Sequence, residues 1–295
     1  MSNNKHINSD NNSFRDIARA LTVVENNLKG SAELLRNLKF NKTTPIIGIT
    51  GPPGAGKSTL VNSLIDLLVT DGSKIAVLAI DPTSPFNFGS LLGDRIRMAS
   101  HFNSPDVFIR SLATRGSLGG LSAKTIEMAD VLRASGFDYV LIETVGVGQS
   151  EIEIAGLADI TLVVLVPEGG DEIQHIKSGL MEIADAFIIN KADRADADVF
   201  ANNLKKIIGQ KHGEQPPVFK TIASQAGGIQ EIADFIKSPV KTQHNRRELL
   251  LTEKAYKLIQ QKLTQHIDKK KLQHDVTKAL KDEKFNLYSF VDTYV

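Results

Sequence analysis

The feature that most constrains this chain is the stretch GPPGAGKST at residues 51–59, which has the G-x-x-x-x-G-K-[ST] spacing of a phosphate-binding loop. The apolar run IIGIT precedes it, and the amphipathic run LVNSLIDLLV follows it. This order predicts a strand, a loop and a helix, in which backbone N–H groups and the helix N-terminus face one anion. The predicted nucleotide-binding residues of this stretch are Gly51, Pro52, Pro53, Gly54, Ala55, Gly56, Lys57, Ser58 and Thr59.

Two side chains of this loop have separate predicted roles. Lys57 reaches the β- and γ-phosphates and counts among the predicted catalytic residues. The Ser58 hydroxyl is a predicted ligand of Mg²⁺.

The stretch NKAD at 190–193 indicates which base is bound. Asp193 can accept hydrogen bonds from N1–H and the exocyclic amino group of guanine, whereas adenine has no donor at either position. Asn190 can brace the loop and donate to N7, and the stem of Lys191 can lie along the ring. Alone, Asp193 could equally cap the next helix. Downstream of a phosphate loop, the pattern favours GTP and GDP as ligands.

Three carboxylates stand where metal and water chemistry is expected. Asp81 ends the second predicted strand, Asp94 lies in GDRIRM, and Glu143 ends a strand in ETVG, a Glu version of the D-x-x-G element. Each alone would more often be a cap or a surface charge. Beside a phosphate loop, they are predicted Mg²⁺ ligands, some acting through water.

Three glycine-rich stretches, 114–122, 146–151 and 167–174, are predicted switch loops that a γ-phosphate orders. Gln149 or Arg115 could orient water or offset charge on the transferring phosphoryl group, although Arg115 fits a structural ion pair as well. No single catalytic base is indicated. The predicted catalytic set is therefore Lys57, Asp94, Glu143 and Gln149.

The rest of the chain from 45 to 237 alternates apolar runs with amphipathic ones, which predicts an α/β fold with a mostly parallel sheet flanked by helices. Predicted strands are 45–50, 74–80, 107–111, 138–143, 160–166, 185–190 and 217–222. Predicted helices are 57–70, 91–101, 122–135, 174–182, 197–209 and 228–237.

Four regions are predicted. Residues 1–12 form a disordered tail, 13–40 form N-terminal helices, 41–240 form the nucleotide-binding core, and 241–295 form a helical extension. Helices at 244–267 and 271–283 carry apolar stripes, and 285–295 is rich in aromatics. Such a stripe can fold back on the core or pair with a second subunit.

Composition bounds the function further. With 35 basic and 34 acidic residues the net charge is +1, which gives no reason to expect nucleic acid or a membrane as partner. There is no cysteine, which excludes thiolate metal sites and cysteine nucleophiles. The polar N-terminus has neither a secretory nor a transit pattern, so a cytoplasmic protein is expected.

Six stretches, in order, make the family recognisable: GPPGAGKSTL at 51–60, IDPTSPFNFGSLLGDRIRM at 80–98, IRSLATRGSLGGLS at 109–122, ETVGVGQSE at 143–151, DEIQHIKSGLMEIAD at 171–185, and NKAD. They resemble the MeaB/ArgK/MMAA family of GTPase chaperones of adenosylcobalamin-dependent methylmalonyl-CoA mutase. The resemblance runs from about residue 14 to 240.

This resemblance implies a SIMIBI-type GTPase fold, a homodimer with a C-terminal dimerisation arm, and a B12-dependent acyl-CoA mutase as partner. It implies Lys57, Ser58, Asp81, Asp94 and Glu143 around phosphates and magnesium. It places Gln174 and Lys177, with Arg115, in switch loops that sense the partner. The element behind guanine, usually Ser-Ala, reads TIASQAGGI at 221–229 here, so Ala223 and Ser224 are its candidates.

Two other functions use the same fold. A nickel metallochaperone for urease or hydrogenase needs Cys or clustered His, and here Cys is absent and the seven His are scattered. An ATPase or kinase serving basic-amino-acid transport is disfavoured by NKAD, and no site for a second substrate is visible.

Overall fold

The computed structural model describes residues 13–40, 44–81, 98–113, 123–144, 153–167, 178–209, 215–238, 244–264, 266–282 and 285–294. The chain forms two compact units, Met1–Leu251 and Thr252–Val295. Each unit is described by itself below.

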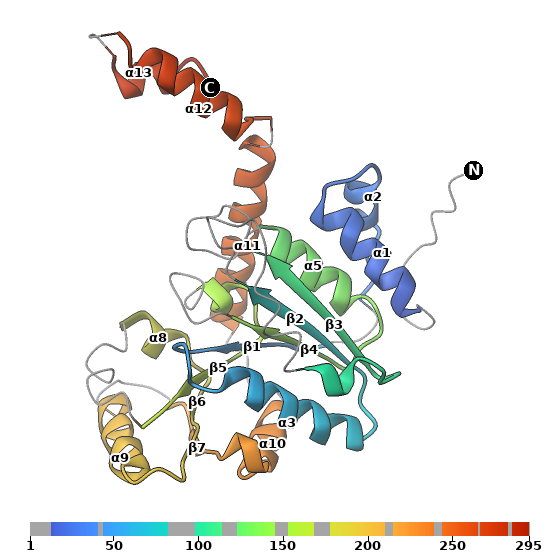
Figure 1. The fold of residues 1–295 in the computed structure, drawn as a ribbon, viewed down its shortest axis with the longest axis vertical. Coiled ribbons are helices and arrows are strands. Elements are labelled where there is room, and N and C mark those ends of the chain that lie inside the picture. Colours follow the sequence, from blue (N-terminus) through green and yellow to red (C-terminus); the bar gives the residue numbers. More distant parts are fainter. Residues whose placement is uncertain are drawn as a thin grey trace. The chain divides into compact units, whose positions relative to one another are not determined.

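The first unit is built on a seven-stranded sheet with the order β3-β2-β4-β1-β5-β6-β7, and every pairing between these strands is parallel (Figure 1). The predicted parallel α/β fold is therefore confirmed. The strands are β1 Ile46–Thr50, β2 Ile75–Asp81, β3 Val107–Ala113, β4 Tyr139–Glu143, β5 Ile160–Leu165, β6 Ala186–Ile189 and β7 Val218–Lys220.

Strand β3 is longer than the predicted 107–111. Its last residue, Ala113, pairs with Asp81 at the end of β2, so the ladder between the two strands continues to their carboxyl ends. The sequence pattern fades there because Arg110 and Ser111 are polar, whereas the backbone pairing does not depend on side-chain polarity.

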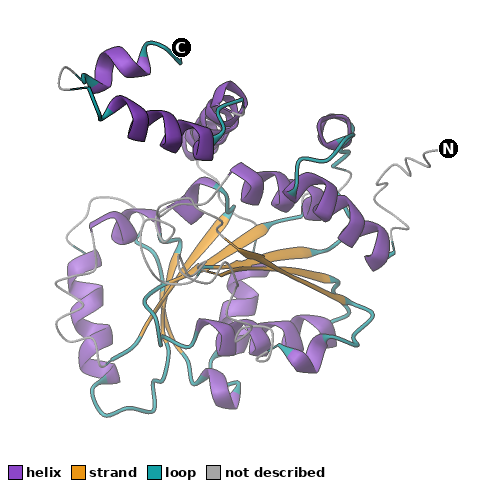
Figure 2. Cartoon of the chain, turned by 45° about the horizontal axis from the view of Figure 1, so that its top comes forward, coloured by secondary structure: helices purple, strands orange, loops and turns teal. Residues whose placement is uncertain are grey.

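Helices cover both faces of the sheet (Figure 2). The helices of the first unit are α1 Phe14–Glu25, α2 Ser31–Arg36, α3 Lys57–Thr70, α5 Ala123–Arg133, α8 Ser178–Ile183, α9 Ala197–Ile208 and α10 Ile229–Lys237, with short 3-10 turns at Ala99–His101, Ile154–Gly156 and Ala223–Gln225. Of the helix predicted over 91–101, only residues 98–101 are described, and they form the first of these turns.

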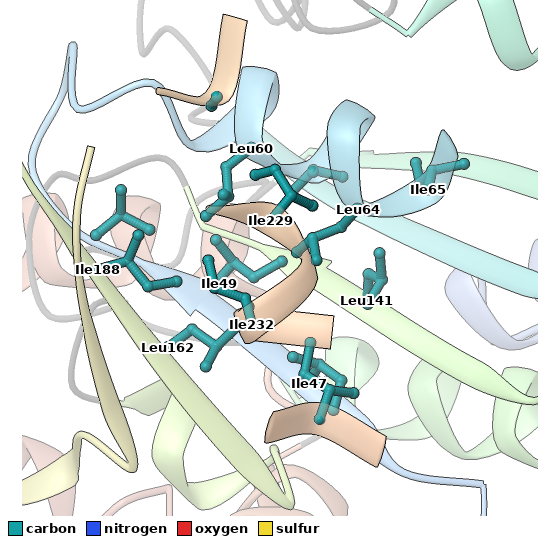
Figure 3. Packing of buried hydrophobic residues seen from close by; sticks show 14 of the residues in the cluster. Ile47, Ile49, Leu60, Leu64, Ile65, Leu141, Leu162, Ile188, Ile229 and Ile232 are labelled. Atoms are coloured by element: carbon teal, nitrogen blue, oxygen red, sulfur yellow. The ribbon is translucent and has the colours of Figure 1, made fainter. Parts of the chain in front are cut away.

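Successive side chains of a strand point to opposite faces of the sheet, so the core is divided into two clusters, one on each face. In β5, Leu162 and Val164 pack with α3 and α10, whereas Val163 and Leu165 pack with α8 and α9. Figure 3 shows the first of these clusters, in which Leu60 of α3 lies near Ile229 of α10 and Ile232 lies beside the strands. Because every residue of β1 and β5 is buried, these strands carry apolar side chains on both faces.

The N-terminal helix α1 packs against the sheet unit. Its apolar stripe is buried, and its first residue, Phe14, makes an edge-to-face contact with Phe108 of β3, with ring centroids 5.6 Å apart. At the other end, Glu25 pairs with Arg110 of β3 at 2.7 Å. The helix is fixed by apolar contact at one end and an ion pair at the other. The buried stripe is Ile17, Ala20, Leu21 and Val24.

The second unit consists of helical segments. Helix α11 (His244–Thr264) enters it, α12 spans Lys269–Ala279, and α13 spans Leu287–Val291. Helix α12 begins two residues before the predicted 271–283 because the Asp268 side chain accepts hydrogen bonds from the N–H groups of Lys270 and Lys271. These hydrogen bonds, that of Lys271 first, lower the pKa of Asp268.

In the described part of this unit, the C-terminal segment contacts α12 through a side-chain hydrogen bond. The Tyr294 hydroxyl donates to Asp275 of α12 at 2.6 Å, and Phe290 of α13 lies against Tyr294. That hydrogen bond raises the pKa of Tyr294. No residue of the described part of 252–294 is buried.

Among the described helices, none combines the length and the apolar character that crossing a membrane requires.

Candidate guanine-nucleotide site

The phosphate loop connects β1 to α3 at the carboxyl edge of the sheet. Residues 51–56 form the loop, and Lys57 is the first residue of α3. Lys57 is 6% exposed, and its Nζ donates to the carbonyl oxygens of Gly51 at 2.8 Å and Pro52 at 3.0 Å. These bonds hold the ammonium group over its own loop, which is where a bound phosphate would meet it.

Two glycines are required by the shape of this loop. Gly51 has φ 139°, and a Cβ there would lie 2.0 Å from the carbonyl oxygen of Val164 on β5. Gly56 has φ 83°, and a Cβ there would lie 2.4 Å from Nδ2 of Asn190. Both the left-handed backbone and the close neighbours exclude a larger residue at these positions.

The start of α3 is linked to the end of β4. The Ser58 hydroxyl donates to Oε1 of Glu143 at 2.7 Å, and both side chains are buried. The sheet brings them together because β4 lies beside β1, with Glu143 paired to Ile49. A serine hydroxyl and a carboxylate are oxygen donors of the kind that Mg²⁺ prefers, so the pair fits a magnesium site.

The other predicted metal ligands are less fully described. The backbone of Asp81 ends β2, as the sequence indicated, and Asp94 lies outside the described residues. Within the described part of the chain, no three His, Asp or Glu side chains form a group that could hold a metal.

Asn190 joins the base loop to the phosphate loop. It follows β6, and its Nδ2 donates to the carbonyl of Ala55 at 2.9 Å. Its Oδ1 accepts from the hydroxyl of Thr221 at 3.2 Å and from the N–H of Ala223 at 3.1 Å. Asn190 is 3% exposed, so these bonds are shielded from water. The side chain therefore joins three segments: its own base loop, the phosphate loop and the segment from Thr221 to Ala223.

The rest of NKAD forms a turn. Lys191 has φ 57°, a left-handed conformation, and the N–H of Ala192 donates to the carbonyl of Thr221 at 3.0 Å. Asp193 follows and is exposed, so its carboxylate is accessible to a ligand. The turn thus directs one buried amide inward and leaves one carboxylate at the surface.

The candidates behind guanine lie beside this turn. Ala223 is buried and begins a 3-10 turn, while Ser224 is exposed. The Ala223 carbonyl accepts a hydrogen bond from the Ser63 hydroxyl of α3 at 2.7 Å. The phosphate-loop helix therefore also contacts the turn that begins at Ala223.

Several predicted residues lie outside the described part of the chain: Arg115, Gln149, Gln174 and Lys177. Sequence reasoning missed four residues whose hydroxyl groups make hydrogen bonds next to the site: Thr50, Ser63, Thr144 and Thr221. Thr50 and Thr144 directly flank Gly51 and Glu143, so their place next to motif residues at strand ends is a signal that could have found them.

The fold and the paired loops define a class of protein, the P-loop GTPases. A family model described as methylmalonyl-CoA mutase-associated GTPase MeaB matches residues 17–279, and the chain belongs to this family. The chain is therefore a GTP hydrolase, as predicted.

Relatives agree with this assignment. A protein of Pyrococcus abyssi is 50% identical over 230 residues, which cover 76% of this chain and 71% of the Pyrococcus protein. The GTPase ArgK of Escherichia coli is 40% identical over 228 residues, covering 73% and 69%. A crystal structure of a protein named LAO/AO transport system kinase is 25% identical, with a TM-score of 0.62, covering 95% of this chain and 91% of that one.

Proposed function

We propose that this GTPase is a chaperone of an adenosylcobalamin-dependent methylmalonyl-CoA mutase, or of a related acyl-CoA mutase, and that it gates loading and protection of the cofactor. The observation that carries the proposal is the match to a mutase-associated GTPase family over most of the chain. The Asn190 network supports the nucleotide half, because it couples the base loop to the phosphate loop through one buried side chain.

In this proposal, guanine is read by Asp193, with Lys191 along the ring and the segment around Ala223 and Ser224 behind it. Asn190 holds this loop in place. Because Asp193 is exposed and lies three residues after the buried Asn190, its carboxylate is accessible to the two guanine donors.

The phosphates would lie over residues 51–59, with Lys57 against the β- and γ-phosphates. Ser58, Asp81, Asp94 and Glu143 would hold Mg²⁺ directly or through water. The metal would neutralise charge on the transferring phosphoryl group. Gln149 would position the attacking water, and the intrinsic rate would be low because positioning alone carries the catalysis.

Arg115, Gln174 and Lys177 are the proposed switch residues that respond to the mutase. Residues 241–295 are the proposed dimerisation arm, outside the nucleotide-binding core of 41–240 and the N-terminal helices of 13–40. Exposed apolar side chains of α11 support the assembly role: Tyr256 at 57%, Ile259 at 54% and Leu263 at 67%.

The experiment measures GTP turnover with and without the purified mutase of the same host, alongside mutase binding in the GDP and GTP-analogue states. We expect the mutase to accelerate turnover and to bind with different affinity in the two nucleotide states. The reason is that the mutase and the γ-phosphate are both proposed to shift the conformational equilibrium of the same switch loops. Unchanged turnover together with nucleotide-independent binding would contradict the chaperone function.

A base-switched variant provides an internal control. Asp193→Asn should exchange guanine for xanthine, since xanthine carries a carbonyl where guanine carries the amino group. Acceleration of XTP turnover by the mutase in this variant alone would show that the response passes through this site. If the mutase still accelerated GTP turnover, and not XTP turnover, in this variant, the activity would be assigned to a contaminating enzyme.

A further inference from the structure

Two buried threonines connect the strand before the phosphate loop to the strand that ends in Glu143. Oγ1 of Thr144 donates to Oγ1 of Thr50 at 2.9 Å, across 94 positions of sequence. Thr144 is 1% exposed and Thr50 is 0% exposed, so water does not compete for this hydrogen bond.

Thr50 lies just before the phosphate loop, and Thr144 is the second residue of the ETVG stretch, at a position to which the motif assigns no role. Thr50 is the last residue of β1 and precedes Gly51, and Thr144 follows Glu143 at the end of β4. The N–H of Thr144 also donates to the carbonyl of Ile49 at 3.0 Å. Thr144 is therefore fastened to β1 twice, once by its backbone and once by its side chain.

Together these bonds hold Glu143 and the residue after it. Ser58 donates to Glu143 from one side at 2.7 Å, while Thr144 fixes the next peptide to Thr50 from the other. The backbone that carries the Glu143 side chain is joined directly to the peptide of Thr144, so its position depends on where that peptide is held. Fixing that peptide consequently fixes the point from which the Glu143 side chain reaches Ser58, and the hydrogen bond from Ser58 then orients the carboxylate.

We propose that Thr144 is a positioning residue for GTP hydrolysis, which with Thr50 sets the Glu143 carboxylate against the start of α3. The inference rests on the proposed role of Glu143 near the metal and γ-phosphate. Packing alone does not require a hydroxyl at either position, because valine has the same branched shape and would fill the space without polar atoms.

The test compares three single variants in the full chain. Thr144→Val removes the hydroxyl and keeps the shape, while Thr144→Ser keeps the hydroxyl. Thr161→Val is the matched control: Thr161 is a 0% exposed threonine of β5 whose hydroxyl has no hydrogen-bond partner among the described residues. Single-turnover GTP cleavage and GDP affinity are measured for each, with thermal unfolding alongside.

We expect Thr144→Val to cleave GTP about tenfold more slowly while GDP affinity changes by less than about twofold, because cleavage is sensitive to small misplacements and GDP lacks the γ-phosphate. Thr144→Ser and Thr161→Val should cleave at the wild-type rate. Wild-type cleavage by Thr144→Val, or an equal loss of cleavage and GDP affinity, would overturn the inference.

Two further variants separate the possible failures. The double variant Thr50→Val with Thr144→Val replaces the hydrogen-bonded pair by an apolar pair that leaves no hydroxyl unpaired. Its thermal stability should return toward wild type while cleavage stays slow, and recovery of both would reduce the pair to a structural role. Glu143→Ala is measured in parallel. If it is slow and Thr144→Val is not, only the positioning role fails, whereas wild-type cleavage by Glu143→Ala contradicts the proposed role of Glu143, and with it the inference.

Discussion

The two units of this chain place their polar and apolar groups in opposite ways. In the first unit, polar side chains such as Lys57, Glu143 and Asn190 are buried and hydrogen-bonded behind a nucleotide loop. In the second, apolar side chains such as Ile259 are exposed along a helix. Buried polar groups need partners that the fold already supplies, whereas an exposed apolar stripe needs a partner from elsewhere.

The difference indicates a division of labour. The first unit holds a preorganised site, because its buried polar groups would lose hydrogen bonds, and so free energy, if they rearranged. In the described part of the second unit after Thr252 no residue is buried, so its apolar stripe is exposed. If this comparison is right, substitutions in one unit should affect nucleotide chemistry and those in the other should affect assembly, with little crossover.

The largest effect is expected from Lys57→Ala. Removing the one side-chain cation of the loop should lower affinity for GDP and for a non-hydrolysable GTP analogue by more than about a hundredfold. Isothermal titration measures this, with Lys206→Ala on the exposed face of α9 as control. Affinity like that of the control would mean that the loop is a turn that binds no phosphate. That result would contradict the assignment of nucleotide binding to the first unit.

Glu143→Ala and Asp94→Ala should slow GTP cleavage by about a hundredfold and change its Mg²⁺ dependence, while GDP affinity falls much less. The reason is that both carboxylates are proposed to act around the metal and the γ-phosphate. Single-turnover cleavage across a Mg²⁺ titration is the measurement, and Glu231→Ala on α10 is the control. Wild-type rates and metal dependence would return both carboxylates to capping roles.

The second unit is tested by oligomeric state. The full chain should be a homodimer in solution, and Ile259→Lys in the exposed stripe should yield a monomer that still binds GDP. Light scattering decides both, with Val199→Lys, an equally exposed apolar position on α9, as the matched control. A folded, monomeric wild-type chain at micromolar concentration would exclude the assembly role.

Asp193→Asn should weaken GTP binding by about 1–3 kcal/mol and favour xanthine nucleotides, because two guanine donors lose a carboxylate acceptor. Competition binding with GDP, XDP and ADP measures this. Asp196→Asn is a suitable control, since Asp196 is exposed three residues away and its side chain makes no capping hydrogen bond. A wild-type preference for ADP would contradict the whole account of base recognition.

The smallest effect is expected at the surface of the first unit. Lys237 of α10 is paired with Asp71 after α3, and this hydrogen bond raises the pKa of Lys237 above its usual 10.5. Lys237→Met should lower the free energy of unfolding by less than about 1 kcal/mol at neutral pH, because the pair is solvated.

The pH dependence of that effect has a definite sign. A raised lysine pKa stabilises the fold fully below 10.5 and loses the contribution as pH rises through the higher folded-state value. Urea unfolding of wild type and Lys237→Met at neutral and alkaline pH measures the difference. A gap that widens with pH would contradict the assigned pair.

Much of the first unit could be read from sequence because its signals are local. The spacing of Gly51, Gly56 and Lys57 specifies a loop, and alternating apolar runs specify strands and helices. Boundaries were less accurate where pairing or capping decided them, as at Ala113 and Asp268. The apolar stripe of α11 was visible too, although its period leaves both folding back and pairing open.

What the sequence by itself determined is which groups this protein has for binding a nucleotide: a phosphate loop, a base-reading loop and acidic strand ends. Only the tertiary structure decided how these groups are held together. The bonds Thr144–Thr50, Ser58–Glu143 and Asn190–Ala55 span 94, 85 and 135 positions. The first two depend on β4 lying beside β1, and the third depends on β6 lying beside β5. Strand order is a property of the packed sheet that local spacing does not encode.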